Sequence, residues 1–182
     1  ADVVVLTGSN LAWCHPVLYQ RIVAAQKKRG TKIVVIDPRR TASCDGADLH
    51  LAIAPGADVA LFNGLLSEIS RRGQIDPVFA RNISGLEQAL ASAMREDLSV
   101  TGLSAEELRC FFDMWCGTEK VVTIFSQGVN QSSSGTDKVN AILNCHLATG
   151  RIGKPGSGPF SVTGQPNAMG GREVGGLANM LA

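Results

Sequence analysis

Short runs of consecutive apolar residues recur along this chain, and most of them end in a small polar loop. Continuous β-branched and aliphatic runs at 3–6, 32–36 and 120–125 are typical of parallel strands that are buried on both faces, and 49–53 predicts a shorter strand. Stretches with helical spacing separate these runs. The alternation predicts an α/β fold that is Rossmann-like, with a mostly parallel sheet and helices on both faces.

Apolar residues at helical spacing predict helices at about 16–29, 58–72 and 136–149. Most of 74–117 is expected to be helical as well. Glycine and proline then become frequent, so 150–176 is predicted to be mostly loop.

Local signals mark several helix ends. Pro16 suits a first helical position, and Gly30 is well placed to end the same helix. Asp58 is a candidate N-cap for the helix after the third strand. Ser104 and Glu107 have the spacing of a capping box.

Composition describes one domain of ordinary size with a tail. The chain has 182 residues, of which 45% are hydrophobic, and 17 basic residues against 16 acidic ones leave a net charge of +1. This balance argues against a nucleic-acid partner. The apolar runs fall far short of the ~20 residues that a membrane span needs, so no membrane association is expected. The domains are predicted to be 1–150 and a glycine- and proline-rich tail, 151–182.

Cysteine and histidine spacing indicates no metal site or catalytic set. No C-x-x-C pair is present, so the cysteines are expected to be buried thiols of a reducing cytosol; they are Cys14, Cys44, Cys110, Cys116 and Cys145. The three histidines lie far apart, and His146 is expected in the core. The chain starts on a strand-like run without Met, so we expect an internal segment of a larger protein.

Polar and glycine residues gather at the predicted carboxyl ends of the strands, where open parallel sheets bind ligands. Glycine lets a backbone amide approach a phosphate closely. The segments are Gly8-Ser9-Asn10, Asp37-Pro38-Arg39-Arg40, Pro55-Gly56-Ala57-Asp58 and Ser126-Gln127-Gly128. Together they are able to hold a nucleotide.

Each residue type suits one part of that ligand. Asp37, which closes the second strand, suits the two hydroxyls of a ribose, while Arg39 and Arg40 suit phosphate. The Asp58 carboxylate can accept two hydrogen bonds from guanine. The alternative is structural: Gly8 serves a tight turn, Asp37 caps, and the arginines face water. The G-x-G-x-x-G fingerprint is absent, which argues against a standard NAD site.

Four segments, in this order and spacing, resemble the prokaryotic molybdenum oxidoreductases that bind two molybdopterin guanine dinucleotides: TGSNLAWCHP, KIVVIDPRRT, LAIAPGADVAL and SQGVNQSSSGTDKVNAILNCHLATGRIGKPGSGPFSVTGQPNAMGGREVGG. The resemblance covers nearly the whole chain. It implies a Rossmann-like domain that holds the guanine dinucleotide end of one cofactor, with 151–182 leading to a neighbouring active-site domain.

The resemblance also implies a role for each site residue. Gly8, Ser9 and Asn10 would form the phosphate loop. Asp37 and Arg39 would contact the ribose and phosphate region, and Asp58 would bind the guanine. The loop nearer the pterin would contain Gln127, Gly128 and Asn130.

The tail separates the subfamilies. Formate dehydrogenases of this group resemble R-G-Q-N-N where this chain has Thr163-Gly164-Gln165-Pro166-Asn167. The segment 169–175 is instead similar to nitrate reductases, in which the arginine binds or steers nitrate, so Arg172 is the expected nitrate-binding residue. The resemblance is nearest to the assimilatory cytoplasmic enzymes, which predicts a cytoplasmic location. A formate dehydrogenase, another molybdopterin oxidoreductase and a stand-alone nucleotide-binding module are the alternatives.

The implied reaction is the reduction of nitrate to nitrite by oxygen-atom transfer at molybdenum. The family's cysteine motif for a [4Fe-4S] cluster, its metal-ligating cysteine and its carboxy-terminal pterin-binding domain have no counterpart here. The chain is therefore expected to be inactive by itself, to bind the cofactor weakly at best and to act with the remaining domains of the same polypeptide. The electron donor is not implied.

Overall fold

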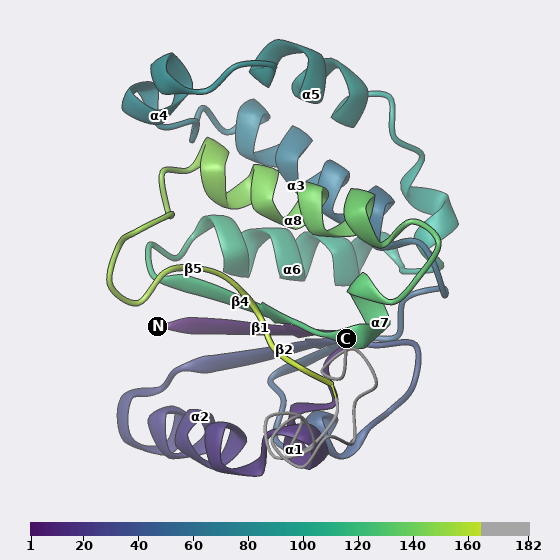
Figure 1. Ribbon diagram of the computed structural model, residues 1–182, viewed down its shortest axis with the longest axis vertical. Coiled ribbons are helices and arrows are strands. Elements are labelled where there is room, and N and C mark those ends of the chain that lie inside the picture. The colour runs from purple at the N-terminus through teal and green to yellow at the C-terminus, as the bar shows by residue number, and fades with distance from the viewer. Residues whose placement is uncertain (165–182) are drawn as a thin grey trace, which may run out of the picture.

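A five-stranded parallel sheet forms the centre of the computed structural model, which describes residues 1–164 (Figure 1). The strand order is β3-β2-β1-β4-β5, with every neighbouring pair parallel. The strands are β1 (Val3–Thr7), β2 (Lys32–Ile36), β3 (Leu49–Leu51), β4 (Val121–Phe125) and β5 (Gly158–Ser161). The α/β, Rossmann-like prediction is confirmed.

Helices cover both faces of this sheet (Figure 1). One face carries the short α1 (Leu11–Cys14) and α2 (Pro16–Arg29). The other face carries the larger layer: α3 (Asp58–Arg71), α4 (Pro77–Asn82), α5 (Leu86–Ala93), α6 (Ala105–Cys116) and α8 (Gly135–Ala148). Two short 3-10 turns, Ala42–Cys44 and Leu98–Thr101, complete the connections together with α7 (Gln127–Asn130).

The continuous apolar strands feed two cores. Successive side chains of a strand point to opposite faces, so Val3 and Val5 pack under the larger helical layer while Val4 and Leu6 pack against α1 and α2. All of β1 is buried, as expected for a central strand. Trp115 is fully buried in the larger core. Burying a large apolar side chain contributes about 1.5–3 kcal/mol, which favours this layered arrangement.

The predicted helix ends are confirmed at three places. Pro16 is the first residue of α2, and Gly30 ends it in the left-handed conformation, with φ 74° and its N–H donating to the Gln26 carbonyl. Ser104 and Glu107 form the expected capping box at the start of α6. These ends are local and need no tertiary partner.

Two expectations about the chain path are wrong, and one holds with a short strand added. Asp58 is not the N-cap of α3, because Ala57 takes that position and the Asp58 carboxylate turns to a lysine of α8. The loop predicted at 150–176 contains β5, an edge strand formed by backbone pairing with β4, where Pro159 is tolerated. The third strand ends at Leu51 rather than at residue 53.

The prediction that every cysteine is a buried thiol is also wrong. Cys110 is exposed on α6 and Cys14 is half-buried, whereas the other three are buried and all five are free. Within residues 1–164, no cluster of three or more acidic, histidine or cysteine side chains is placed to hold a metal. Over the same residues, no helix has the length and apolar character needed to cross a bilayer.

Candidate functional site

A cleft of about 620 Å³ opens at the carboxyl edge of the sheet, where the strands end. There the chain leaves β1 toward one face and leaves β4 toward the other, which is the topological switch point at which open α/β sheets bind ligands. Its lining includes all but one of the predicted cofactor-binding residues: Gly8, Ser9, Asn10, Asp37, Arg39, Asp58, Gln127 and Gly128.

Two glycines bring the loops after β1 and β4 into backbone contact on the floor of the cleft. The Gly128 N–H donates to the Gly8 carbonyl at 3.0 Å, and Gly8 has φ +54°. A Cβ on Gly8 would lie 2.8 Å from the Gly128 Cα, and a Cβ on Gly128 would lie 2.7 Å from the Gly8 Cα. Only glycine at both positions permits this approach, which leaves backbone rather than side chains facing the cleft.

Polar side chains beside these glycines have no partner among residues 1–164. The Ser9 Oγ, the Asn10 Oδ1 and the Ser126 Oγ are buried and make no hydrogen bond within that range, and all three residues line the cleft. A buried polar atom left unpaired costs about 1–3 kcal/mol. Asn10 also adopts a left-handed conformation, with φ 39°. Three uncommitted groups on one wall are typical of a polar ligand site.

Asp37 and Arg39 form the wall that follows β2. The Asp37 side chain is nearly buried, and its Oδ1 accepts a hydrogen bond of 2.9 Å from the Arg39 backbone N–H. The ring of His50 contacts the Asp37 carbonyl at 3.0 Å. In contrast, the Arg39 side chain is 78% exposed, and its Nε lies 3.6 Å from the Asp37 Oδ1. The carboxylate is therefore fixed, and the guanidinium is free to meet an anion.

A buried ion pair joins the helices on the far wall. The Lys138 Nζ lies 2.8 Å from the Asp58 Oδ2, and both side chains are almost fully buried. Sequence reasoning identified Asp58 and missed Lys138, although both line the cleft. The available signal was a lysine in the first turn of a helix, where the macrodipole disfavours a cation.

The last described residues return to the cleft. Gly164 lines it beside Gln127, and the His15 ring contacts the Thr163 carbonyl. Asn130 does not line the main cleft; it lies in an adjoining depression of about 250 Å³ that Gln127 also borders. The predicted nitrate-binding Arg172 lies outside the described residues.

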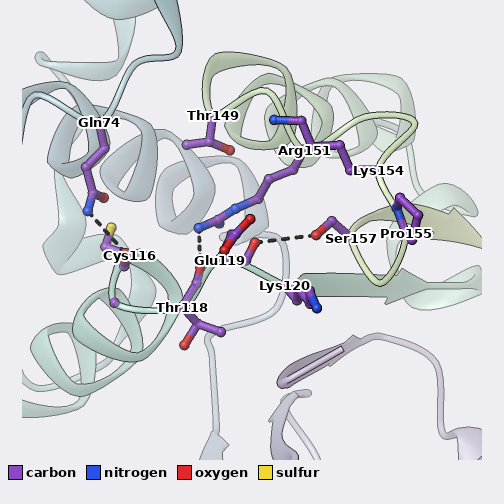
Figure 2. A pocket seen from close by; sticks show the side chains of 11 residues that line it. Gln74, Cys116, Thr118, Glu119, Lys120, Thr149, Arg151, Lys154, Pro155 and Ser157 are labelled. Atoms are coloured by element: carbon purple, nitrogen blue, oxygen red, sulfur yellow. Dashed lines mark hydrogen bonds between the residues drawn. The ribbon is translucent and has the colours of Figure 1, made fainter.

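A second cavity, of about 720 Å³, lies at the opposite, amino edge of the sheet (Figure 2). It contains none of the predicted site residues. Its Arg151 is buried, donates to the carbonyls of Trp115 and Thr118, and stacks 3.9 Å above the Trp115 ring. Burial lowers the pKa of Arg151 to about 10, so the group is still charged at neutral pH. These contacts close the carboxyl end of α6.

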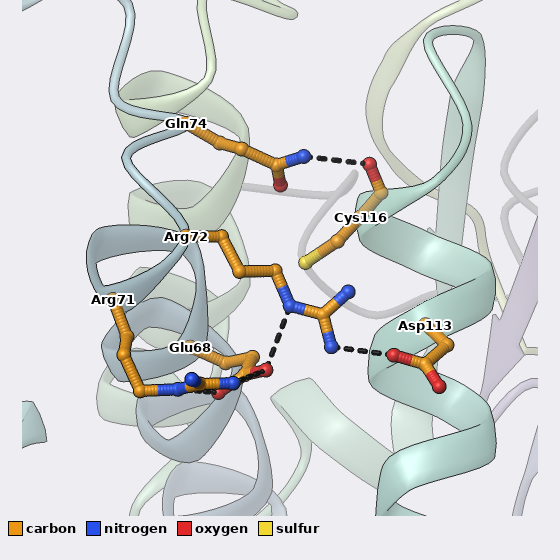
Figure 3. A network of polar contacts seen from close by, with 6 residues as sticks. All are labelled: Glu68, Arg71, Arg72, Gln74, Asp113 and Cys116. Carbon is orange, nitrogen blue, oxygen red and sulfur yellow. Dashed lines mark hydrogen bonds and ion pairs between the residues drawn. The ribbon is translucent and has the colours of Figure 1, made fainter.

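Ion pairs next to that cavity join α3 to α6 (Figure 3). Arg72 contacts Glu68 on its own helix and Asp113 on α6, and Gln74 donates to the Cys116 carbonyl. Hydrogen bonds from Arg71, and then from Arg72, lower the pKa of Glu68 to about 2. The polar side chains at this edge are therefore engaged in joining helices.

Comparison with known proteins identifies the family of the chain. The family described as molybdopterin oxidoreductase matches residues 1–181. The chain belongs to the molybdopterin oxidoreductase family. It is 52% identical over 187 residues to a nitrate reductase of Klebsiella oxytoca, covering 100% of this chain and 21% of that protein. The chain thus spans about a fifth of that relative's length.

Two more distant matches extend the comparison. The chain is 35% identical to the F420-dependent formate dehydrogenase subunit alpha of Methanocaldococcus jannaschii, over 100% of this chain and 28% of that protein. Among solved structures, acetylene hydratase from Pelobacter acetylenicus superposes with a TM-score of 0.76 at 24% identity, covering 85% of this chain and 22% of that one. This likeness shows the fold.

Proposed function

We propose that this chain binds the nucleotide end of a molybdopterin guanine dinucleotide within a larger nitrate reductase. The family implies a molybdenum–pterin cofactor. The observation that carries the proposal is the cleft at the switch point, which gathers the predicted residues from four strand ends.

The residues present fit such a group. Within residues 1–164 the Ser9 Oγ and the Ser126 Oγ are buried hydroxyls without partners, and the Gly8–Gly128 floor has no side chain to keep a diphosphate away. The exposed Arg39 guanidinium adds positive charge, and the fixed Asp37 carboxylate suits the hydroxyls of a ribose. Asp58, with its buried carboxylate, is assigned to guanine.

This assignment gives the cofactor and the residues of the chain separate roles. When it is bound, the molybdenum cofactor supplies two-electron oxygen-atom transfer, which is the chemistry that reduces nitrate to nitrite. The residues of this chain hold one arm of the group and fix its orientation. Arg172 is assigned to attract and orient the nitrate anion, because a cation in a desolvated site stabilises an anion strongly.

Nitrate is favoured over formate by two observations. The named nitrate reductase is more similar to this chain than the named formate dehydrogenase subunit, at 52% against 35% identity. Thr163 also stands where the formate dehydrogenases are expected to have arginine. We assign the whole enzyme to the cytoplasmic assimilatory class, with its [4Fe-4S] cluster and metal ligand in other domains and with a separate electron donor.

Nitrite production by the full-length enzyme with a reduced dye tests the proposal. Cells grown with molybdate should yield activity, and cells grown with tungstate should not. Formate oxidation, assayed in parallel, should be absent. Formate oxidation without nitrite production would favour the formate dehydrogenase alternative, and guanine nucleotide binding with neither activity would favour a stand-alone binding module.

Substitution of Arg172 sharpens this test. Arg172→Ala should raise the KM for nitrate or lower kcat while leaving the molybdenum content unchanged. Arg109→Ala is the matched control, because Arg109 is exposed on α6, away from the cleft. Wild-type kinetics in Arg172→Ala would exclude its assignment to nitrate.

A further inference from the structure

The Asp58–Lys138 pair is unusual for its place in the fold. Asp58 is the first residue of α3 and Lys138 lies in the first turn of α8, so the contact joins two helix starts on one wall of the cleft. The lysine side chain is 4% exposed and the aspartate side chain 10%. Within residues 1–164 neither group has a second ion-pair partner, so each is the sole counter-charge of the other.

Stability does not account for this pair. A cation in the first turn of a helix opposes the macrodipole, and taking two charges out of water costs several kcal/mol per ion. Replacing a buried ion pair by apolar residues of similar volume often leaves the stability of a protein unchanged or raises it. Lys138 instead lines the cleft together with Ser132, Ser133 and Ser134. Its position on the cleft wall therefore points to a role in binding.

The hydrogen-bonding chemistry of the pair favours one nucleobase over another. An ionised carboxylate only accepts hydrogen bonds, and guanine presents two adjacent donors, its N1–H and its 2-amino group. Adenine presents a donor beside an acceptor, which instead matches a protonated carboxyl group. A buried carboxylate that loses its counter-charge neutralises itself by taking up a proton. Lys138 thus determines whether Asp58 presents only acceptors, which match guanine, or a donor beside an acceptor, which match adenine.

We infer that Lys138 is a positioning residue that sets the base preference of the cleft by holding Asp58 as an acceptor-only carboxylate. This inference rests on the proposed function. It assigns the discrimination between guanine and adenine nucleotides to a pair of residues rather than to Asp58 alone.

The test is titration of the 182-residue chain with GDP and with ADP, followed by NMR so that millimolar dissociation constants are measurable. The wild type should prefer GDP by roughly tenfold or more, the effect of one mismatched buried hydrogen-bonding group. Lys138→Met should bring the preference below about threefold, and Lys138→Arg should restore it, since the positive charge returns.

Two further variants keep the test decisive. The double variant Lys138→Met/Asp58→Asn removes both charges, so it remains interpretable if Lys138→Met alone fails to fold, and it should show no preference for GDP. Lys154→Met, at the opposite edge of the sheet, should bind as the wild type does. Full GDP preference in a folded Lys138→Met chain would overturn the inference alone, and in the double variant it would also remove Asp58 from the guanine site. Equal binding of GDP and ADP by the wild type, or binding of neither, would overturn the inference, whereas nitrite production by the full-length enzyme tests the proposed function separately.

Discussion

The two edges of the sheet each carry a large cavity, and the two cavities use their polar groups in opposite ways. The amino-edge cavity is the larger, about 720 Å³ against 620 Å³. At that edge Arg72, Gln74 and Arg151 are all committed to neighbouring helices (Figures 2 and 3). At the carboxyl edge Ser9 and Ser126 carry buried polar atoms that have no hydrogen-bond partner in the described part of the chain. Uncommitted polar groups, rather than volume, therefore distinguish the cleft that we propose as the ligand site.

Unpaired buried polar atoms alone do not distinguish the two cavities. The Trp115 Nε1, the His146 Nδ1 and the Arg151 Nη1 are also buried without partners among residues 1–164. Arg151 stacks over the Trp115 ring, and the His146 ring meets Trp115 edge-to-face with the ring centroids 5.4 Å apart. The aromatic face stabilises the cation directly. Only Arg151 of the three lines the amino-edge cavity, so this stack belongs to the core.

The difference has a cause in the architecture. In a parallel α/β sheet the helices that follow the strands start at the carboxyl edge and end at the amino edge. Helix ends leave carbonyls unpaired, and basic side chains such as Arg151 satisfy them. Helix starts and strand-end loops present N–H groups and small side chains instead. Opposite edges therefore favour helix closure and ligand binding, respectively.

The largest expected effect is on stability at the amino edge. Arg151→Met removes two hydrogen bonds, one to the Trp115 carbonyl of α6 and one to the Thr118 carbonyl just after it, together with the stack on Trp115, so the free energy of unfolding should fall by about 3 kcal/mol. Urea denaturation measures this. Lys120→Met, at an exposed position of the same cavity, should change it by less than about 0.5 kcal/mol. Equal effects of the two substitutions would remove the structural role given to Arg151.

The second largest effect is expected at the floor of the cleft. Gly8→Ala places a Cβ against the backbone of Gly128 at a positive φ, which should cost about 2 to 3 kcal/mol of stability and weaken guanine nucleotide binding. Gly30→Ala is the control, because Gly30 also has a positive φ but has no atom within 4 Å of the added Cβ, so only about 1 kcal/mol should be lost. Matching losses would show that the backbone contact is dispensable.

The buried histidine should make stability depend on pH. Burial, and then the nearby Arg151 cation, lower the pKa of His146 to about 3. Below pH 6.5 the unfolded chain takes up a proton that the folded chain excludes, so stability falls as the pH drops from about 6.5 toward 3. Between pH 7 and pH 5 this amounts to about 2 kcal/mol. Urea titrations at both pH values should show most of this decline absent in His146→Gln; an unchanged decline would assign it to other groups.

The smallest effect concerns the ion pairs between α3 and α6. Arg72 is about a quarter exposed, so its pairs with Glu68 and Asp113 are screened by solvent. Arg72→Met should lower the free energy of unfolding by at most about 1 kcal/mol and should leave guanine nucleotide binding unchanged. A clear loss of binding would show that the two edges are coupled.

Residues whose role depends on their neighbours in sequence were the predictable ones. The apolar runs of β1, β2 and β4, and the capping box of Ser104 and Glu107, follow from local physics. The glycines and acidic residues at strand ends followed from the rule that parallel strands share an edge. In contrast, β5 has no apolar pattern of its own and exists because its backbone pairs with β4.

Periodicity, glycine placement and motif order were enough to predict the layered α/β architecture, a polar cleft at the strand ends and the resemblance to molybdopterin oxidoreductases, because all three patterns are carried by nearby residues. Tertiary structure alone decided which distant side chains meet. It turned Asp58 from a helix cap into half of an ion pair with Lys138, and it brought Gly8 against Gly128 and Arg151 over Trp115. Such contacts depend on how helices pack across the sheet, which no local pattern records.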